Sequence, residues 1–223
     1  MRIEAKNIQF QFLLVGLFFY LLVAPFLIHV PFAYIVVNLL LSFVLLSALF
    51  TLQKNKALKY ISFILITLLL LPLWINLSGI IHISLIITYS ILSIYLLFLI
   101  SSLLYHFFSA KKVTANTIYA ALCLYLLIGI LWGAIYALVN DLIPGSFQGS
   151  ILNLPEIPEM QLHGFIYYSF TTLTTLGYGD IVPKTLQAAA LCQAEAIIGQ
   201  FFTSVLIAQL VGIRVAQHLR KKS

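Results

Sequence analysis

The chain has 223 residues, of which 62% are hydrophobic and only 8% are charged, and its mean hydropathy is +1.09. This composition excludes a soluble globular protein and predicts a membrane protein built from helices. The formal net charge of +6 comes from short basic clusters between apolar stretches. There is no basic stripe interleaved with aromatic residues, so nucleic acid is excluded as a partner. Cys123 and Cys192 lie inside apolar stretches and are expected to pack there, not to form a disulfide or a metal pair.

Apolar stretches long enough to cross a bilayer follow one another along the chain. About 20 apolar residues span the hydrocarbon core, and turn signals and polar breaks divide these stretches into six predicted spans. The spans are residues 8–28, 31–52, 60–77, 80–108, 117–140 and 186–213. A secretory signal peptide is the alternative for the first span, but the apolar run is too long and lacks a small-residue cleavage site.

Residues 1–110 contain the first four spans and form the first predicted domain. The fourth span carries neither lysine nor arginine. Moving one elementary charge across 100 mV yields about 2.3 kcal/mol, so a neutral span extracts almost nothing from the membrane potential. We therefore expect this four-helix domain to lack the arginines of a voltage sensor and the activity of the protein to depend weakly on membrane voltage.

Residues 111–223 form the second predicted domain. After the span over 117–140 comes a loop, residues 140–161, with several prolines and glycines and the acids Asp141, Glu156 and Glu159. These acids either concentrate cations near the loop or belong to an ordinary solvated loop. A short apolar helix over 162–175 follows, which cannot cross the bilayer. We expect it to enter as a re-entrant loop, which is tolerated at membrane depth only where protein or water surrounds it.

Residues 174–180 have the sequence Thr-Thr-Leu-Gly-Tyr-Gly-Asp. The segment resembles the selectivity filter of potassium channels. In such a filter, successive carbonyl oxygens of an extended strand replace the hydration shell of K⁺. The resemblance assigns these carbonyls to Thr175, Leu176, Gly177 and Tyr178, with the Thr175 hydroxyl as the innermost ligand.

Gly177 and Gly179 permit backbone angles that a residue with a Cβ resists. The side chains of Leu176 and Tyr178 are expected to brace the strand against the short helix. The alternative, a Gly-Tyr turn in an extracellular loop, is disfavoured by the re-entrant context.

Residues 170–212 as a whole resemble the pore of potassium channels, particularly the bacterial ion-channel-2 type. Pro183 follows Asp180 by three residues and Gly199 follows it by nineteen, as in that family. Two departures are Leu176 in place of the commoner valine and Thr171 where some members have glutamate. The resemblance implies further roles: support of the filter by Tyr167, Tyr168, Thr171, Asp180 and Glu195; an inner-helix hinge at Gly199; a cavity and gate lined by Thr203, Ile207, Val211 and Val215; and an outer mouth at Val182.

Three of these assignments have alternatives. Gly199 serves either as a hinge or for close helix packing. Glu195 is the one charge in the last span, and its expected work is structural, accepting hydrogen bonds from the back of the short helix. The histidines are expected to be interfacial or packing residues. His163, near the start of the short helix, is nevertheless the best candidate for sensing external protons.

The distribution of basic residues predicts the orientation in the membrane. In a six-span arrangement one side receives Arg2, Lys6, Lys54, Lys56, Lys59, Lys111, Lys112, Arg214, Arg220, Lys221 and Lys222, and the other receives Lys184. By the positive-inside rule both termini are cytoplasmic and the protein is a multi-pass protein of the cell membrane, in contact with its lipids. The sequence ends at Ser223, soon after the last span, so no nucleotide- or calcium-binding domain is expected.

The sequence therefore predicts an all-α membrane protein with six spans, a re-entrant pore helix and a filter loop. The resemblance implies a homotetramer that conducts K⁺ passively, because one filter strand supplies a quarter of each carbonyl cage. We expect no enzymatic activity and no cofactor beyond K⁺ as the permeant ion. The alternatives are a pore-loop potassium transporter, which usually has four pore loops in one chain, and a non-conducting regulatory subunit.

Overall fold

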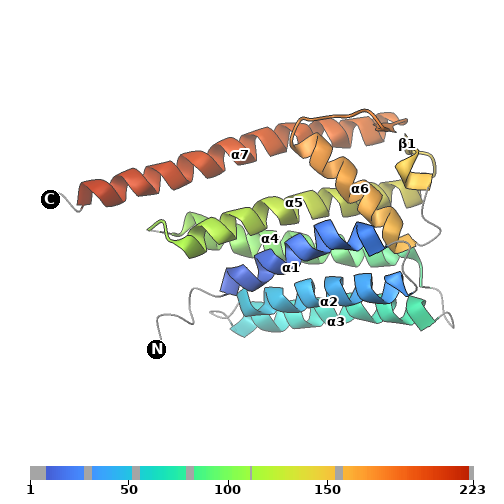
Figure 1. Ribbon diagram of the computed structural model, residues 1–223, viewed down its shortest axis with the longest axis horizontal. Coiled ribbons are helices and arrows are strands. Elements are labelled where there is room, and N and C mark those ends of the chain that lie inside the picture. The colour runs from blue at the N-terminus through green and yellow to red at the C-terminus, as the bar shows by residue number, and fades with distance from the viewer. Residues whose placement is uncertain are drawn as a thin grey trace.

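The computed structural model describes residues 9–27, 32–51, 56–78, 83–110, 112–153 and 158–220, which are almost entirely helical (Figure 1). In chain order the helices are α1 (Gln9–Val23), η2 (Ala24–Leu27), α2 (Ala33–Thr51), α3 (Lys56–Ser78), α4 (Leu85–Phe108), α5 (Ala115–Leu142), η3 (Ile151–Asn153), α6 (Pro158–Leu173) and α7 (Leu186–Arg220). Two short strands, β1 (Phe147–Gly149) and β2 (Ile181–Pro183), complete the described fold.

Every predicted span contains a long helix. By length and composition, five of the described helical stretches are able to cross a membrane: α1 with η2, α3, α4, α5 and α7. In α2 the described apolar stretch, Ile35–Leu49, is shorter. A capping box marks the start of α5, where the Thr114 hydroxyl accepts from the Thr117 amide and the Thr117 hydroxyl accepts from the Thr114 amide.

Residues 140–161, which the sequence predicts to be a loop, contain the strand β1, so that expectation is corrected here. β1 pairs antiparallel with β2, and Gln148 lies opposite Val182. Gly149 makes the pairing possible, since a Cβ there would lie 2.8 Å from the Asp180 carbonyl oxygen. Strands of three residues are too short for a hydrophobic alternation to reveal them.

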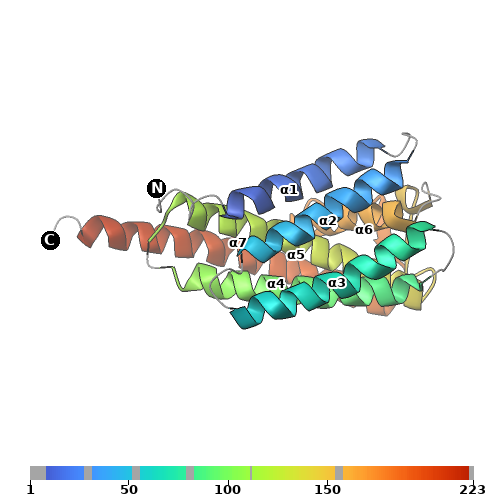
Figure 2. The same ribbon diagram turned by 90° about the horizontal axis from the view of Figure 1, so that it is seen from below.

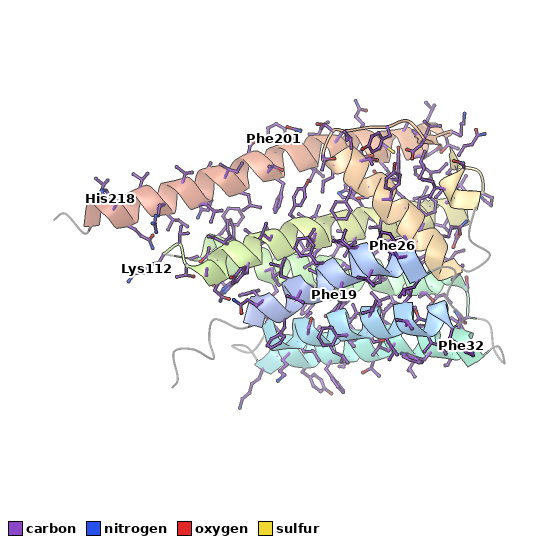
Figure 3. The ribbon with its side chains drawn as sticks, in the orientation of Figure 1. Phe19, Phe26, Phe32, Lys112, Phe201 and His218 are labelled. Atoms are coloured by element: carbon purple, nitrogen blue, oxygen red, sulfur yellow. The ribbon has the colours of Figure 1, made fainter. Side chains whose placement is uncertain are left out.

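The long helices lie roughly parallel to one another, whereas α6 crosses them obliquely (Figures 1 and 2). α4 and α1 pack against α5 of the same chain, and α6 packs between α5 and α7. α1 begins and α7 ends at the same end of the molecule, and β1 lies at the opposite end. Lys112 and His218 also lie at the end where α1 begins (Figure 3).

The outer surface, like the core, contains many large apolar side chains. Leu13 and Leu17 of α1, Leu99 of α4 and Leu124 of α5 are almost fully buried between the helices. Phe19 of α1 and Phe26 of η2, labelled in Figure 3, are more than half exposed. In water such a surface would aggregate, so its natural solvent is lipid. α7 is the least covered of the long helices, with Phe201 exposed.

Candidate functional site

The end of α6 holds the first half of the Thr174–Asp180 segment through the backbone. After the last helical turn, the Thr175 amide donates to the Thr172 carbonyl at 2.9 Å. The amides of Leu176 and Gly177 then both donate to the Thr171 carbonyl, at 2.9 and 3.1 Å. One helix C-terminal carbonyl therefore anchors two consecutive residues of the predicted filter. Thr171, buried at 6% exposure, acts here through its backbone, since its hydroxyl donates to the Tyr168 carbonyl.

The two glycines of the segment have the backbone angles that the sequence predicts. Gly177 has φ of +53° and Gly179 has φ of +79°, in the left-handed region. Thr175 is also in this region, with φ of +60°. That angle is unusual for a β-branched residue and costs on the order of 1–3 kcal/mol, which the surrounding contacts must offset. Strain of this kind clusters at functional sites, and sequence reasoning did not anticipate it at Thr175.

Gln200 of α7 is a further polar neighbour of the segment that sequence reasoning missed. Its Nε2 donates to the Thr175 hydroxyl oxygen at 3.4 Å. The signal available in the sequence is an amide side chain directly after Gly199, the glycine nineteen residues beyond Asp180.

Leu176 and Tyr178 are largely exposed within the single chain, and their bracing of the strand against α6 stays a prediction. Their side chains are 56% and 67% exposed. Of the backbone amides of the segment, those of Thr174 to Gly177 bond to the last turn of α6, and the chain then leaves the helix. More than half of each side chain therefore lies on the surface of the single chain.

The far end of the segment is held by side chains. The Tyr167 hydroxyl of α6 donates to Asp180 Oδ2 at 2.7 Å, and this bond raises the pKa of Tyr167 to about 12. Asp180 Oδ1 accepts from the Ile181 amide at 3.1 Å, where β2 begins. Val182 follows in β2 and is partly exposed. The predicted filter is thus tied at both ends to α6 and at its exit to a small sheet.

A second set of contacts lies behind α6, on the side away from the segment. Glu195 of α7 is fully buried, and its Oε1 lies 2.5 Å from the Ser169 hydroxyl of α6. Its Oε2 accepts from the Tyr136 hydroxyl of α5. The hydroxyl of Tyr168 lies 3.1 Å from the sulfur of Cys192. Sequence reasoning placed Glu195 against the short helix but did not identify Ser169 or Tyr136. Cys123 is buried and Cys192 is partly buried, and both are free thiols.

Glycines allow α5, α6 and α7 to approach closely. A Cβ on Gly133 of α5 would lie 2.8 Å from the Cα of Ile166, and one on Gly199 of α7 would lie 2.7 Å from the Leu173 carbonyl oxygen. α7 remains helical on both sides of Gly199. Packing against the end of α6 accounts for this glycine, and its role as a hinge stays a prediction. Further along α7, Thr203, Ile207, Val211 and Val215 are all exposed.

His163 is unsuited to the proton-sensing role considered for it. It is 8% exposed and its ring lies 4.8 Å from that of Tyr20, measured between centroids. Its Nε2 has no hydrogen-bond partner within the described part of the chain. Burial lowers the pKa of His163 to about 4, so it stays neutral over the physiological range.

Comparison with a protein-family model covers this same C-terminal region. Residues 121–214 match a family model described as "Ion channel". Over 69 residues the chain is 32% identical to the potassium channel protein kcv of Paramecium bursaria Chlorella virus 1, which covers 31% of this chain and 72% of the viral protein. The chain belongs to the potassium channel pore family. It is also 31% identical over 68 residues to the human potassium channel subfamily K member 17, a stretch that covers 30% of this chain but only 20% of the human protein.

Family membership and the apolar helices together confirm two expectations. The chain is a multi-pass helical membrane protein, and it belongs to a class of channels and not of enzymes. The matched region begins within α5 and ends within α7, so it contains the whole Thr174–Asp180 segment and Glu195.

Proposed function

We propose that the chain is the subunit of a K⁺-selective channel through which K⁺ flows passively. The observation that carries the proposal is the left-handed backbone of Thr175, Gly177 and Gly179, on a strand bonded to a helix C-terminus. Because left-handed residues occupy every second position of this strand, successive carbonyl oxygens can face one side, which a dehydrated K⁺ requires. The ligands are the carbonyls of Thr175, Leu176, Gly177 and Tyr178.

The subunit forms a homotetramer around the filter. One strand supplies a quarter of each K⁺ cage, so closure needs four copies. The exposed side chains of Leu176 and Tyr178 and the uncovered face of α7 are the surfaces that neighbouring copies cover. In this arrangement Thr203, Ile207, Val211 and Val215 line the cavity and the gate.

The chain crosses the cell membrane six times, with both termini in the cytoplasm. The described basic residues of the predicted cytoplasmic side are Lys56, Lys59, Lys112, Arg214 and Arg220. Lys184, the basic residue assigned to the other side, follows β2, and its amide donates to the Ser146 carbonyl. Arg2, Lys6, Lys54, Lys111, Lys221 and Lys222, which support the same assignment, lie outside the described residues. Residues 1–110 form a four-helix domain without voltage-sensing charges, and residues 111–223 form the pore domain.

The test is a pair of glycine substitutions assayed in liposomes that contain the purified protein alone. Gly177 and Gly145 both have positive φ, +53° and +83°, and neither has any atom within 4 Å of an added Cβ. Gly177→Ala and Gly145→Ala therefore carry a similar local strain, of about 1–2 kcal/mol. We expect Gly177→Ala to abolish K⁺-selective flux and Gly145→Ala to preserve it. Selective flux in both variants would refute the filter assignment, and no flux from the wild type would favour the non-conducting subunit.

A further inference from the structure

Glu195 occupies a closed polar cluster between three helices, defined by Tyr136 and Gly129 of α5, Ser169 of α6 and Glu195 of α7. Its side chain is fully buried, and its two oxygens each contact one hydroxyl group. A buried carboxyl group in an apolar protein must be either paired with a base or neutral. The contacts in this cluster decide between the two.

The number of hydrogens in the cluster determines the state of the acid. The Ser169 hydroxyl oxygen lies 2.5 Å from Glu195 Oε1 and 2.7 Å from the Gly129 carbonyl oxygen. A serine hydroxyl has one hydrogen to donate, and neither a carbonyl nor a carboxylate oxygen has any. Two contacts this short need two hydrogens, so the second belongs to a carboxylic acid O–H of Glu195.

With that hydrogen in place, every contact has one donor and one acceptor. Tyr136 donates to Glu195 Oε2, Glu195 donates to Ser169, and Ser169 donates to the Gly129 carbonyl. Since Tyr136 and Gly129 both belong to α5, the chain of bonds closes a loop through α7 and α6. Hydrogen bonds that run in one direction strengthen one another in a low-dielectric interior.

The surroundings provide no positive charge for an ionised Glu195. The titratable groups that face it in the described part of the chain are Tyr125 and Tyr136 of α5, Tyr168 of α6 and Cys192 of α7. None is basic, and phenols and thiols become negative when they lose a proton. An ionised carboxylate here would be unpaired.

The cluster is connected to the filter by a short path. Ser169 lies two residues before Thr171, whose carbonyl holds the amides of Leu176 and Gly177. If Glu195 gives its proton to the bulk solvent, the Ser169 hydrogen must turn to the carboxylate and release the Gly129 carbonyl. α6 then loses this tie to α5, and the carbonyl that positions the filter moves with it.

We propose that Glu195 is a neutral carboxylic acid that clamps the pore helix, and that removal of its proton at alkaline pH reduces conduction. Its effect on current rests on the proposed channel function, whereas its protonation state does not. Glu195 contacts no permeant ion in this proposal; it is a positioning residue that acts through Ser169.

Infrared spectroscopy of the purified protein in lipid tests the protonation directly. At neutral pH the wild type should show the C=O stretch of a protonated carboxyl group, which Glu195→Gln should remove. Glu159→Gln removes a different carboxyl group and should keep the band. A wild-type spectrum without this band at neutral pH, or a band that survives in Glu195→Gln, overturns the proposal whether or not the protein conducts.

Currents at different pH test the consequence. The side-chain amide of Glu195→Gln reproduces the neutral acid, because its N–H donates to Ser169 and its carbonyl accepts from Tyr136. We expect wild-type and Glu159→Gln currents to fall several-fold from neutral to alkaline pH, and Glu195→Gln current to lose this response. An equal fall in Glu195→Gln would refute the positioning role. An absence of wild-type current together with the infrared band would instead refute the proposed function and leave the neutral acid standing.

Discussion

The proposed pore region, α5–α7, and the four-helix region, α1–α4, are both apolar, but they use their polar side chains differently. In the pore region several hydroxyls bond to a different element, as in Tyr167 to Asp180 and Ser169 to Glu195, while the threonines of α6 bond to a carbonyl of their own helix. In the four-helix region most described hydroxyls bond to a carbonyl of their own helix, as in Ser42 to Asn38 and Ser101 to Leu97. Specific polar contacts therefore help to fix the packing of the pore region, whereas apolar contacts fix most of the packing of the four-helix region.

Tyr95 and Trp74 are exceptions in the four-helix region. The Tyr95 hydroxyl donates to the Leu45 carbonyl at 3.3 Å, and Trp74 Nε1 donates to the Ser42 hydroxyl at the same distance. Both bonds are long. The first joins α4 to α2 and the second joins α3 to α2. The comparison predicts that the same kind of substitution has very different effects in the two regions.

The largest difference is expected for an added methyl group on a helical glycine. At Gly133 of α5 a Cβ meets the backbone of Ile166, whereas at Gly16 of α1 it meets only side-chain atoms of Phe43 and Val44, at 3.3–3.4 Å. Gly133→Ala should destabilise the protein by about 1–3 kcal/mol, because α6 must move. Gly16→Ala should be close to neutral, since the better helix propensity of alanine offsets the tighter contact. Thermal unfolding in detergent measures both, and equal shifts would remove the distinction between the regions.

A smaller effect is expected at the outer mouth. Val182 is partly exposed in β2, and tyrosine is compatible with a strand. In a tetramer, Val182→Tyr should present four rings to external tetraethylammonium and gain about 0.5–2 kcal/mol from cation–π contact. Inhibition curves should shift for Val182→Tyr but not for Val182→Leu, which adds size without a ring. If the two variants are blocked alike, Val182 does not face the mouth.

The smallest effect is expected from the membrane potential. α4 has no lysine or arginine, so we expect the four-helix region to take little energy from the membrane potential. Open probability should change little with voltage, and any residual dependence should vary with K⁺ concentration, because it arises from ions in the filter. A steep curve that is insensitive to K⁺ would show that the four-helix region senses voltage after all.

Much of the pore region could be predicted from sequence because its features are local. The positive φ of Gly177 and Gly179 follows from the residue type within one short motif, and the helix ends lie close to the apolar boundaries. The partners of Glu195 could not be predicted. Tyr136 and Ser169 are far from it in the chain, and neither differs by pattern from neighbouring tyrosines and hydroxyls.

Two further features, the burial of His163 and the backbone angle of Thr175, have the same origin in tertiary structure. His163 resembles any interfacial histidine until α1 brings Tyr20 against it. The left-handed angle of Thr175 arises because the chain must turn back to bond Leu176 and Gly177 to one carbonyl of α6. No periodicity in the sequence records either constraint.

The most direct test of K⁺ selectivity is the reversal potential of purified protein in a planar bilayer, with K⁺ on one side and Na⁺ on the other. A filter built from the carbonyls of Thr175 to Tyr178 should carry almost all the current as K⁺, so the reversal potential should lie far from zero, with the sign set by K⁺ flow. A reversal potential near zero would mean that the segment does not discriminate between the two ions, and would contradict the account.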